Sequence, residues 1–245
     1  MKRVLAVALG ALLLMILTGC RSEKMNPLHK ESGAEQLLVV TTPTWSATEG
    51  QLITYEWSAG KWQEALEPIL IQVGRNGMAW GPGLHDNTFN KPPLKQEGDG
   101  KSPAGIFPLE SLYGYENLTA KMDYLKVDRN TFCVDDPKSK YYNQIVRGDE
   151  VEKDWDSAET MRMESDVYKY GIVVGYNTDP AVPGKGSCIF YHIGTPGSTT
   201  AGCTAMSEGE ILNLIKFLDK SKKPLIVQAP MAEYLVLAKR YDLPR

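Results

Sequence analysis

Apolar and polar positions alternate along most of the chain, and this pattern predicts a mainly β domain. Short runs of Val, Ile, Leu and aromatic residues are bounded by Gly, Pro, Asn or Ser, as is typical of strands joined by turns. The expected strands are LLVVTT (37–42), both arms of the hairpin QLITYEWSAGKWQEAL (51–66), PILIQVG (68–74), YGIVVGYN (170–177), SCIFYHIG (187–194) and PLIVQAP (224–230). The run SCIFYHIG (187–194) places His192 at the end of a strand.

The apolar period becomes helical near the C-terminus. EGEILNLIKFLDK (208–220) spaces apolar residues at helical intervals, and Ser207 with Glu210 three residues later fits a capping box. MAEYLVLAKRYD (231–242) predicts a terminal helix. We therefore expect a mainly β fold of the α+β class, with mixed sheets packed as a sandwich and helices near the C-terminus.

Two segments lack a clear apolar period. Residues 75–105 are rich in Gly, Pro and Asn, which favours turns and long structured loops that often carry function. We expect His85 to be a surface histidine of this loop. Residues 147–168, RGDEVEKDWDSAETMRMESDVY, are dense in charge and are interpreted as a solvated helix or loop.

The N-terminus, MKRVLAVALGALLLMILTGC, has the layout of an export signal. Two basic residues precede an apolar run that is shorter than the roughly 20 residues of a membrane span. LTGC resembles the lipobox of bacterial lipoproteins, which implies lipid attachment at Cys20. A signal cleaved elsewhere and a short uncut anchor are the alternatives. We expect residues 1–19 to be a lipoprotein signal peptide, 20–36 a flexible tether and 37–245 one folded domain.

Composition narrows the possible partners. Cleavage before Cys20 would remove two basic residues and change the formal net charge from −3 to −5. No basic run stands out, so nucleic acid is not an expected partner. The protein is expected to be an exported, membrane-anchored monomer that faces the periplasm or the cell wall.

The four cysteines are Cys20, Cys133, Cys188 and Cys203. If Cys20 carries lipid, three remain in an oxidising compartment, and an odd number leaves one thiol unpaired. The simplest arrangement pairs Cys133 with Cys188 and leaves Cys203 free. Three buried, reduced thiols are the alternative.

Cys203 lies in TAGCTAM, eleven positions after His192. A thiolate is the reactive form of cysteine, and a neighbouring imidazole can accept the thiol proton. Backbone N–H groups at Gly202 and Cys203 could stabilise an oxyanion. Packing is the alternative role for a lone cysteine. A zinc site built from Cys188, His192 and Cys203 lacks a fourth ligand at recognisable spacing, so no metal is expected.

The segment from His192 through TAGCTAM resembles the active-site signature of the L,D-transpeptidases of the YkuD type. Thr200, Gly202, Cys203 and Met206 match that signature, and GDGKSPAGIFPL (98–109) resembles an earlier element of the family. GRNGMAWGPGL and CVDDPKSKYYNQIV are similar to parts of an exported branch. The resemblance covers roughly residues 37–245.

The resemblance implies a thiol acyl transfer on peptidoglycan stem peptides that needs no cofactor. Cys203 is the implied nucleophile and His192 the base, oriented by the carbonyl of Ile193. Release to an amine would give a 3→3 crosslink or exchange the terminal D-residue, whereas release to water would make the protein an L,D-carboxypeptidase. Carbapenems acylate the family's cysteine.

The chain departs from the family pattern at two positions. Ala201 replaces a frequent histidine and Ala205 a frequent arginine, which also motivates a non-catalytic, peptidoglycan-binding alternative. A papain-like amidase is disfavoured because the histidine precedes the cysteine here. The residues expected to line the substrate groove are Arg75, Trp80, Asp135, Asp136, Tyr142, Asn143 and Thr200. Trp80 could instead pack on the core, and Asp135-Asp136-Pro137 is equally a turn signal.

Overall fold

The computed structural model describes residues 27–86, 89 and 91–245. The predicted signal peptide and the predicted lipid attachment at Cys20 lie outside these residues. The helices are α1 (Pro27–Ser32), α2 (Glu208–Phe217) and α3 (Met231–Tyr241), with short 3-10 turns η2 (Asp166–Tyr168) and η3 (Lys220–Lys222). The strands are β1 (Gln36–Thr42), β2 (Glu49–Ser58), β3 (Lys61–Glu64), β4 (Ile69–Gln72), β5 (Met78–Trp80), β6 (Ser102–Gly114), β7 (Tyr124–Lys126), β8 (Thr131–Val134), β9 (Ile145–Arg147), β10 (Ala158–Thr160), β11 (Tyr170–Val174), β12 (Phe190–Ile193), β13 (Thr204–Met206) and β14 (Leu225–Pro230).

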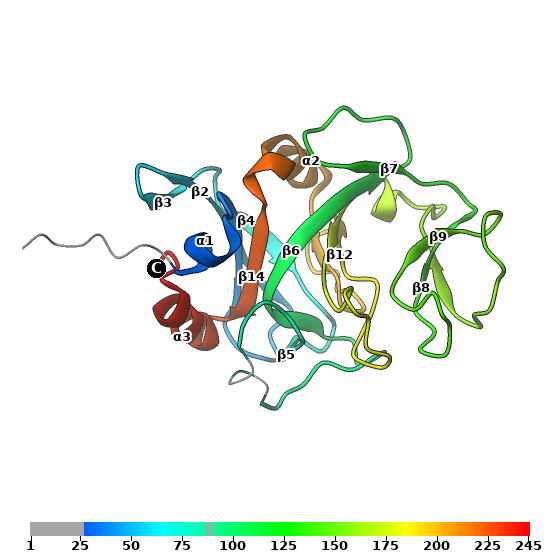
Figure 1. Cartoon of the computed structure of the whole chain (residues 1–245), viewed down its shortest axis with the longest axis horizontal. Helices are drawn as coiled ribbons and strands as arrows, with labels where there is room; N and C mark the ends of the chain where they lie inside the picture. The colour runs from blue at the N-terminus through cyan, green and yellow to red at the C-terminus, as the bar shows by residue number, and fades with distance from the viewer. Residues whose placement is uncertain (1–26, 87–88, 90) are drawn as a thin grey trace, which may run out of the picture.

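The strands confirm a mainly β fold with a mixed main sheet. Its order is β1-β14-β6-β11-β12-β13-β4-β2-β3, and β1 also pairs with β2. The sheet therefore closes on itself, which the expected sandwich did not specify. Figure 1 shows the long β6 crossing the centre of the molecule. A large apolar core packs against this sheet, and its buried side chains include Ile106, Phe107 and Tyr191.

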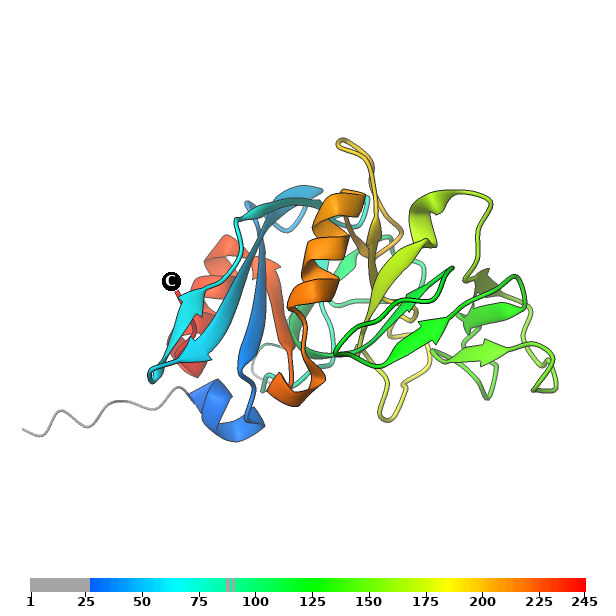
Figure 2. The same cartoon turned by 90° about the horizontal axis from the view of Figure 1, so that it is seen from above.

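The helices form where the sequence predicts them near the C-terminus. Ser207 and Glu210 make the expected capping box at the start of α2. α2 packs against β11 and β12, and α3 packs against β14 and β1. Figure 2 shows α2 lying along the sheet, with α3 and α1 towards the end of the molecule where the described chain begins. No helix in the described part of the chain is long and apolar enough to cross a membrane.

A smaller sheet, with strand order β10-β8-β9, lies at the opposite end from α1 and α3 (Figure 1). It belongs to a second apolar core that includes Tyr113, Tyr168, Phe190 and Cys203. A disulfide joins Cys133 of β8 to Cys188, just before β12, so the pairing suggested by the cysteine count is present. The second core therefore connects the small sheet to the strands of the main sheet.

Three sequence interpretations are corrected. The C-terminal part of the expected tether is structured: α1 forms there because Leu28 is buried against the main core, and His29 stacks on Trp57. The strand β6 begins at Ser102, inside a segment interpreted as loop. The charge-dense residues 147–168 are not simply solvated, because they contain β10 and the fully buried Met161.

His85 is buried, so the expected surface position is wrong. Its ring packs among Trp80, Phe89 and Phe107, and its Nδ1 accepts a hydrogen bond from the N–H of Ile106 at 3.2 Å. Nδ1 is therefore unprotonated. Burial lowers the pKa of His85 to about 4.

The burial of His85 predicts a loss of stability in acid. Because its pKa is lower in the folded than in the unfolded state, the unfolded chain binds more protons between about pH 6.5 and 4, and stability falls as the pH falls through this range. We expect His85 to account for about 2 kcal/mol of lost unfolding free energy between pH 7.5 and 5. Urea unfolding at both pH values, beside His85→Gln, checks this. The same pH dependence in the variant would contradict the assignment.

Candidate active site

His192 lies on β12, and Cys203 immediately precedes β13, the neighbouring strand of the main sheet. The strands β12 and β13 are parallel, with His192 opposite Ala205 and Tyr191 opposite Thr204. Side chains alternate between the two faces of a sheet, so Phe190 and His192 share a face. The N–H of Phe190 lies 3.3 Å from the Cys203 sulfur, which places the thiol next to the start of β12.

Tyr168 joins the surroundings of both residues. Its ring packs edge-on against the His192 ring, with centroids 5.3 Å apart, and against Phe190 at 5.8 Å. Tyr168 and Cys203 belong to the same buried cluster. The candidate nucleophile and base therefore border one aromatic side chain.

His192 is 8 % exposed, and its tautomer follows from one contact. Its Nδ1 lies 2.9 Å from the carbonyl oxygen of Ile193. A carbonyl can only accept a hydrogen bond, so Nδ1 carries the proton and Nε2 has a free lone pair. Burial lowers the pKa of His192, while the Ile193 carbonyl opposes that shift. The ring is thus neutral at neutral pH and available as a base.

Cys203 is 5 % exposed and is the one free cysteine among the described residues. Its Sγ receives the Phe190 N–H and donates to the carbonyl oxygen of Cys188 at 3.5 Å. Burial raises the pKa of the Cys203 thiol, and the negative charge of Glu159 raises it further. The resting pair is therefore a neutral thiol and a neutral imidazole, and attack requires proton transfer to a base.

Hydroxyl groups hold the turn that carries Cys203. Thr200 Oγ1 donates to the Cys203 carbonyl at 2.7 Å, and Ser102 Oγ donates to the same oxygen at 3.0 Å. The Gly202 N–H donates to Thr200 Oγ1 at 3.1 Å. To donate to an oxyanion, the Gly202 N–H would have to give up its hydrogen bond to Thr200 Oγ1. The predicted binding residue Thr200 is buried, and its hydroxyl is engaged by its own turn.

Cys203 opens onto a polar cavity of about 120 Å³. The cavity is lined by Arg75, Lys95, Glu97, Gly98, Asp135, Glu159, Ser187, Cys188, Ile189, Ala201, Gly202 and Cys203. Two cations and three carboxyl groups therefore surround the thiol. An arrangement of this kind can bind a substrate that carries charged groups.

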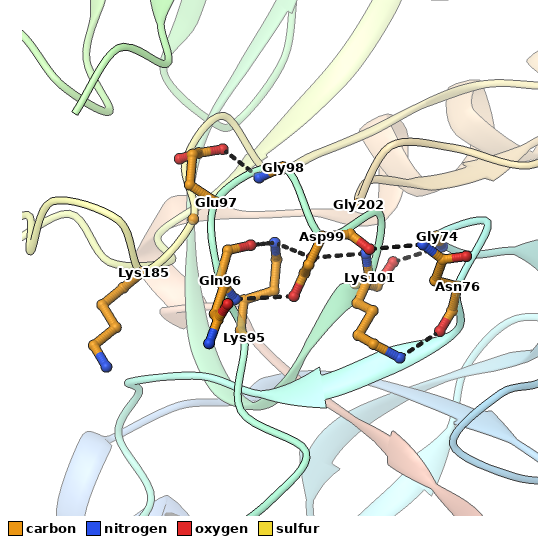
Figure 3. Close-up of polar contacts among 12 residues, drawn as sticks. Gly74, Asn76, Lys95, Gln96, Glu97, Gly98, Asp99, Lys101, Lys185 and Gly202 are labelled. Carbon is orange, nitrogen blue, oxygen red and sulfur yellow. Dashed lines mark hydrogen bonds and ion pairs between the residues drawn. The ribbon is translucent and has the colours of Figure 1, made fainter.

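One wall of the cavity is a loop folded around the Asp99 carboxylate, which Figure 3 shows beside Gly202. Asp99 Oδ1 accepts hydrogen bonds from Lys95 Nζ at 2.7 Å and from the Lys101 N–H at 2.9 Å. Lys95 is buried and also donates to the Gln96 carbonyl. The charge of Lys95 is therefore already compensated within the loop.

Of the residues predicted to bind substrate, Arg75 and Asp135 reach this cavity. Arg75 is exposed and makes no ion pair with any residue in the described ranges. Its main-chain N–H donates to the Thr200 carbonyl at 2.9 Å, which fixes the loop after β4 beside the Cys203 turn. The guanidinium thus stands at the cavity with its hydrogen-bonding capacity unused.

The predicted binding residues Trp80 and Asp136 do not line the Cys203 cavity and instead make structural contacts. Trp80 is 1 % exposed and packs on Trp45 and Phe89. Asp136 accepts the main-chain N–H groups of residues 138 and 156, as the turn interpretation expects. Alternation and turn signals do not reveal that these side chains point inward.

Tyr142 and Asn143 are likewise supports. Tyr142 is buried and its hydroxyl donates to Glu97 Oε2 at 2.5 Å. Asn143 donates to the carbonyls of Tyr176 and of residue 177, and accepts the Cys188 N–H at 2.8 Å. Both side chains therefore position the segment around Cys188, one step removed from the thiol.

Sequence reasoning missed Glu159 and Tyr168. Both lie in the charge-dense segment, and the Tyr168 hydroxyl donates to Glu159 Oε2 at 2.5 Å. The one available signal was the presence of aromatic and apolar residues within a segment that a purely solvated loop would not need. A zinc site that uses Cys188 is excluded, because this residue is in the disulfide.

The comparison with known families agrees with this site. A family model of the L,D-transpeptidase catalytic domain (YkuD) matches residues 44–227, which is most of the chain and includes both Cys203 and His192. No curated protein and no solved structure matches the chain. The chain belongs to the L,D-transpeptidase family, whose members act on peptidoglycan stem peptides.

Proposed function

We propose that the protein is a cysteine-dependent L,D-transpeptidase that transfers acyl groups between peptidoglycan stem peptides. The observation that supports this most is the free Cys203 thiol, which opens onto a polar cavity and immediately precedes β13, the strand that pairs with the His192 strand β12. The free Nε2 lone pair of His192 supplies the base that a thiol of raised pKa needs.

In the first half of the reaction, Cys203 Sγ attacks the carbonyl carbon of an L-centre that is joined to a D-residue. His192 Nε2 takes the thiol proton and delivers it to the leaving amine as the C–N bond breaks. The Ile193 carbonyl keeps the imidazole in the required tautomer. The product is a thioester on Cys203, and the D-residue leaves.

In the second half, a nucleophile attacks the thioester carbonyl and Cys203 leaves as the thiol. An amine from a second stem peptide gives a 3→3 crosslink, and a free D-amino acid gives exchange of the terminal residue. Water gives L,D-carboxypeptidase activity. Main-chain N–H groups at Gly202 and Cys203 are the proposed donors to the oxyanion in both halves.

Arg75 is the proposed partner of a substrate carboxylate. It lines the cavity, and its guanidinium has no ion pair with another described residue. Ala201 also lines the cavity, while Ala205 lies opposite His192 on β13, so neither position of departure carries a charge. A planar guanidinium binds a carboxylate through two parallel hydrogen bonds. Arg75 therefore offers the positive charge that Ala205 cannot.

The proposed setting is a bacterial membrane surface that faces the periplasm or the cell wall. The LTGC motif supports export and lipid attachment at Cys20. Only six residues separate Cys20 from the start of α1 at Pro27, and an extended chain spans at most about 3.6 Å per residue. The catalytic domain would thus stay close to the membrane surface.

The first test is acylation of the thiol by a carbapenem. Incubation of the purified full-length protein in mild detergent should add the mass of one carbapenem, because the strained lactam carbonyl can be attacked by Cys203 with His192 as base. Intact-mass analysis measures the adduct. The control is Cys203→Ala, which should show none.

The opposite result would favour a different function. If Cys203 is shown to be reduced but gains no adduct, and muropeptides pass unchanged, acyl transfer is wrong. Retained sedimentation with peptidoglycan sacculi would then support the non-catalytic wall-binding alternative that Ala201 and Ala205 suggest. Muropeptide analysis of an active protein would separate dimer formation from hydrolysis.

A further inference from the structure

The small sheet brings two carboxyl groups to the cavity of Cys203. Asp135 follows β8 directly, and Glu159 is the central residue of β10. The strands β8 and β10 are antiparallel, with Glu159 opposite Cys133. Both carboxyl groups line the same cavity as the Cys203 thiol. The disulfide at Cys133 fixes this part of the sheet against the segment before β12.

The Asp135 carboxylate has hydrogen-bonding capacity that the protein leaves unused. Its Oδ1 is buried and has no hydrogen-bond partner. No hydrogen bond or ion pair reaches this side chain from any residue within the described ranges. A buried carboxylate oxygen without a donor is costly, so its presence at a cavity that contains a nucleophile indicates a donor supplied from outside.

Glu159 can also accept further hydrogen bonds. It accepts one hydrogen bond, from the Tyr168 hydroxyl, and the two cations of the cavity do not pair with it. Lys95 is bound by Asp99 and the Gln96 carbonyl. The charge of Asp135 also raises the pKa of Glu159. A cation between them would relieve this repulsion.

We infer that Asp135 and Glu159 form the binding site for the protonated amine of the acceptor stem peptide. This inference rests on the proposed function and makes it specific: the thioester is released to an amine rather than to water. An ammonium group supplies up to three donors, which suits two carboxylates with unfilled lone pairs. The small volume of the cavity suits the end of an alkylamine side chain.

The site also solves a chemical problem of the second half-reaction. An alkylamine is mostly protonated at neutral pH and cannot attack until it loses a proton. Glu159 takes that proton. The amine nitrogen then forms the C–N bond, the C–S bond breaks, and the second nitrogen proton passes through His192 to the Cys203 sulfur. The proton on Glu159 leaves to water, and the amine of the D-residue released in the first half-reaction takes one up at neutral pH, so the overall reaction releases no net proton.

The pKa of Glu159 fits this role. Burial is the main cause that raises it, to about 7, and the charges of Asp135 and Glu97 add to the shift, while the hydrogen bond from Tyr168 opposes it. Glu97 itself is occupied by the hydroxyls of Tyr142 and Ser187. A carboxylate of raised pKa accepts a proton from an ammonium more readily than an ordinary one does.

The test measures how much of the thioester is released to an acceptor amine and how much is released to water. Purified full-length protein is incubated with a disaccharide tetrapeptide that carries a diamino acid, and the crosslinked dimer and the hydrolysed tripeptide are quantified together. In Glu159→Gln and in Asp135→Asn, the ratio of dimer to tripeptide should fall at least about tenfold below that of the wild type. Glu152→Gln, an exposed carboxylate of the same segment, is the matched control.

Two outcomes would overturn the inference. If dimer and tripeptide fall together in both variants, these residues support the thiol or the fold and do not bind the acceptor. If the wild type forms tripeptide alone, no acceptor amine is used. Carbapenem acylation separates either result from failure of the proposed function: an adduct that forms normally leaves the Cys203 chemistry intact, whereas a wild type with neither adduct nor product would mean that the proposed function itself is wrong.

Discussion

Replacing His192 with alanine is expected to reduce turnover about 10⁴-fold, because it removes the proposed acceptor of the thiol proton. Burial keeps the Cys203 thiol protonated, so the small thiolate population available without a base cannot substitute for proton transfer. The loss should fall on kcat, since the imidazole acts on reacting atoms. Release of the terminal D-residue from a tetrapeptide measures this.

The control for this variant is His29→Ala. His29 lies in α1, away from the site, and stacks on Trp57. Its removal deletes an imidazole without touching the cavity, so turnover should stay near that of the wild type. Thermal unfolding of both variants checks that the fold survives. Turnover of the folded His192→Ala protein within about tenfold of the wild type would show that another group is the base.

Removing the Cys133–Cys188 disulfide should both destabilise the protein and reduce its activity. The bridge closes a loop with a sequence separation of 55 residues, for which loop-closure entropy gives an upper value of about 4 kcal/mol. The same bridge fixes Cys188, whose carbonyl contacts the Cys203 thiol. The double variant Cys133→Ser/Cys188→Ser avoids a new unpaired thiol and is the appropriate test.

Urea unfolding should show a loss of about 2–4 kcal/mol in this double variant. Activity should be lower even at temperatures where the variant remains folded, because the segment around Cys188 loses its anchor. Adding a reductant should then leave the unfolding free energy and the activity of the variant unchanged. In the wild type, the reductant should lower both quantities towards the values of the variant. Equal unfolding free energies for the two proteins would refute the predicted contribution of the bridge.

The sequence was sufficient for features that depend on local pattern. Alternating apolar residues identified the strands that became β1, β11 and β14, and the Ser207–Glu210 spacing identified the start of α2. The closed order of the main sheet was not predictable, because strand pairing between distant segments leaves no periodic signal. The same limit explains why β6 was interpreted partly as a loop.

Prediction of the site followed the same division. The motif around Cys203 and the strand-end position of His192 pointed to the proposed nucleophile and base, which the structure places on β12 and directly before β13. Glu159 was missed because charge favours a surface interpretation, and only the pairing of β10 with β8 turns it towards Cys203. Asn143 was assigned to substrate, although its amide is used up by main-chain groups, which composition cannot show.

The cluster of three cysteines makes the order of folding and oxidation important. Three thiols can form three different pairs, and just one of these pairs leaves Cys203 free. The contact between Cys203 Sγ and the Cys188 carbonyl, together with the Cys133–Cys188 bond, places the three cysteines close to one another in the folded protein. A Cys188–Cys203 bond formed too early would block the proposed nucleophile. It would also leave β8 without its disulfide link to the segment before β12. The yield of active enzyme therefore depends on whether the small sheet is in place before the thiols are oxidised.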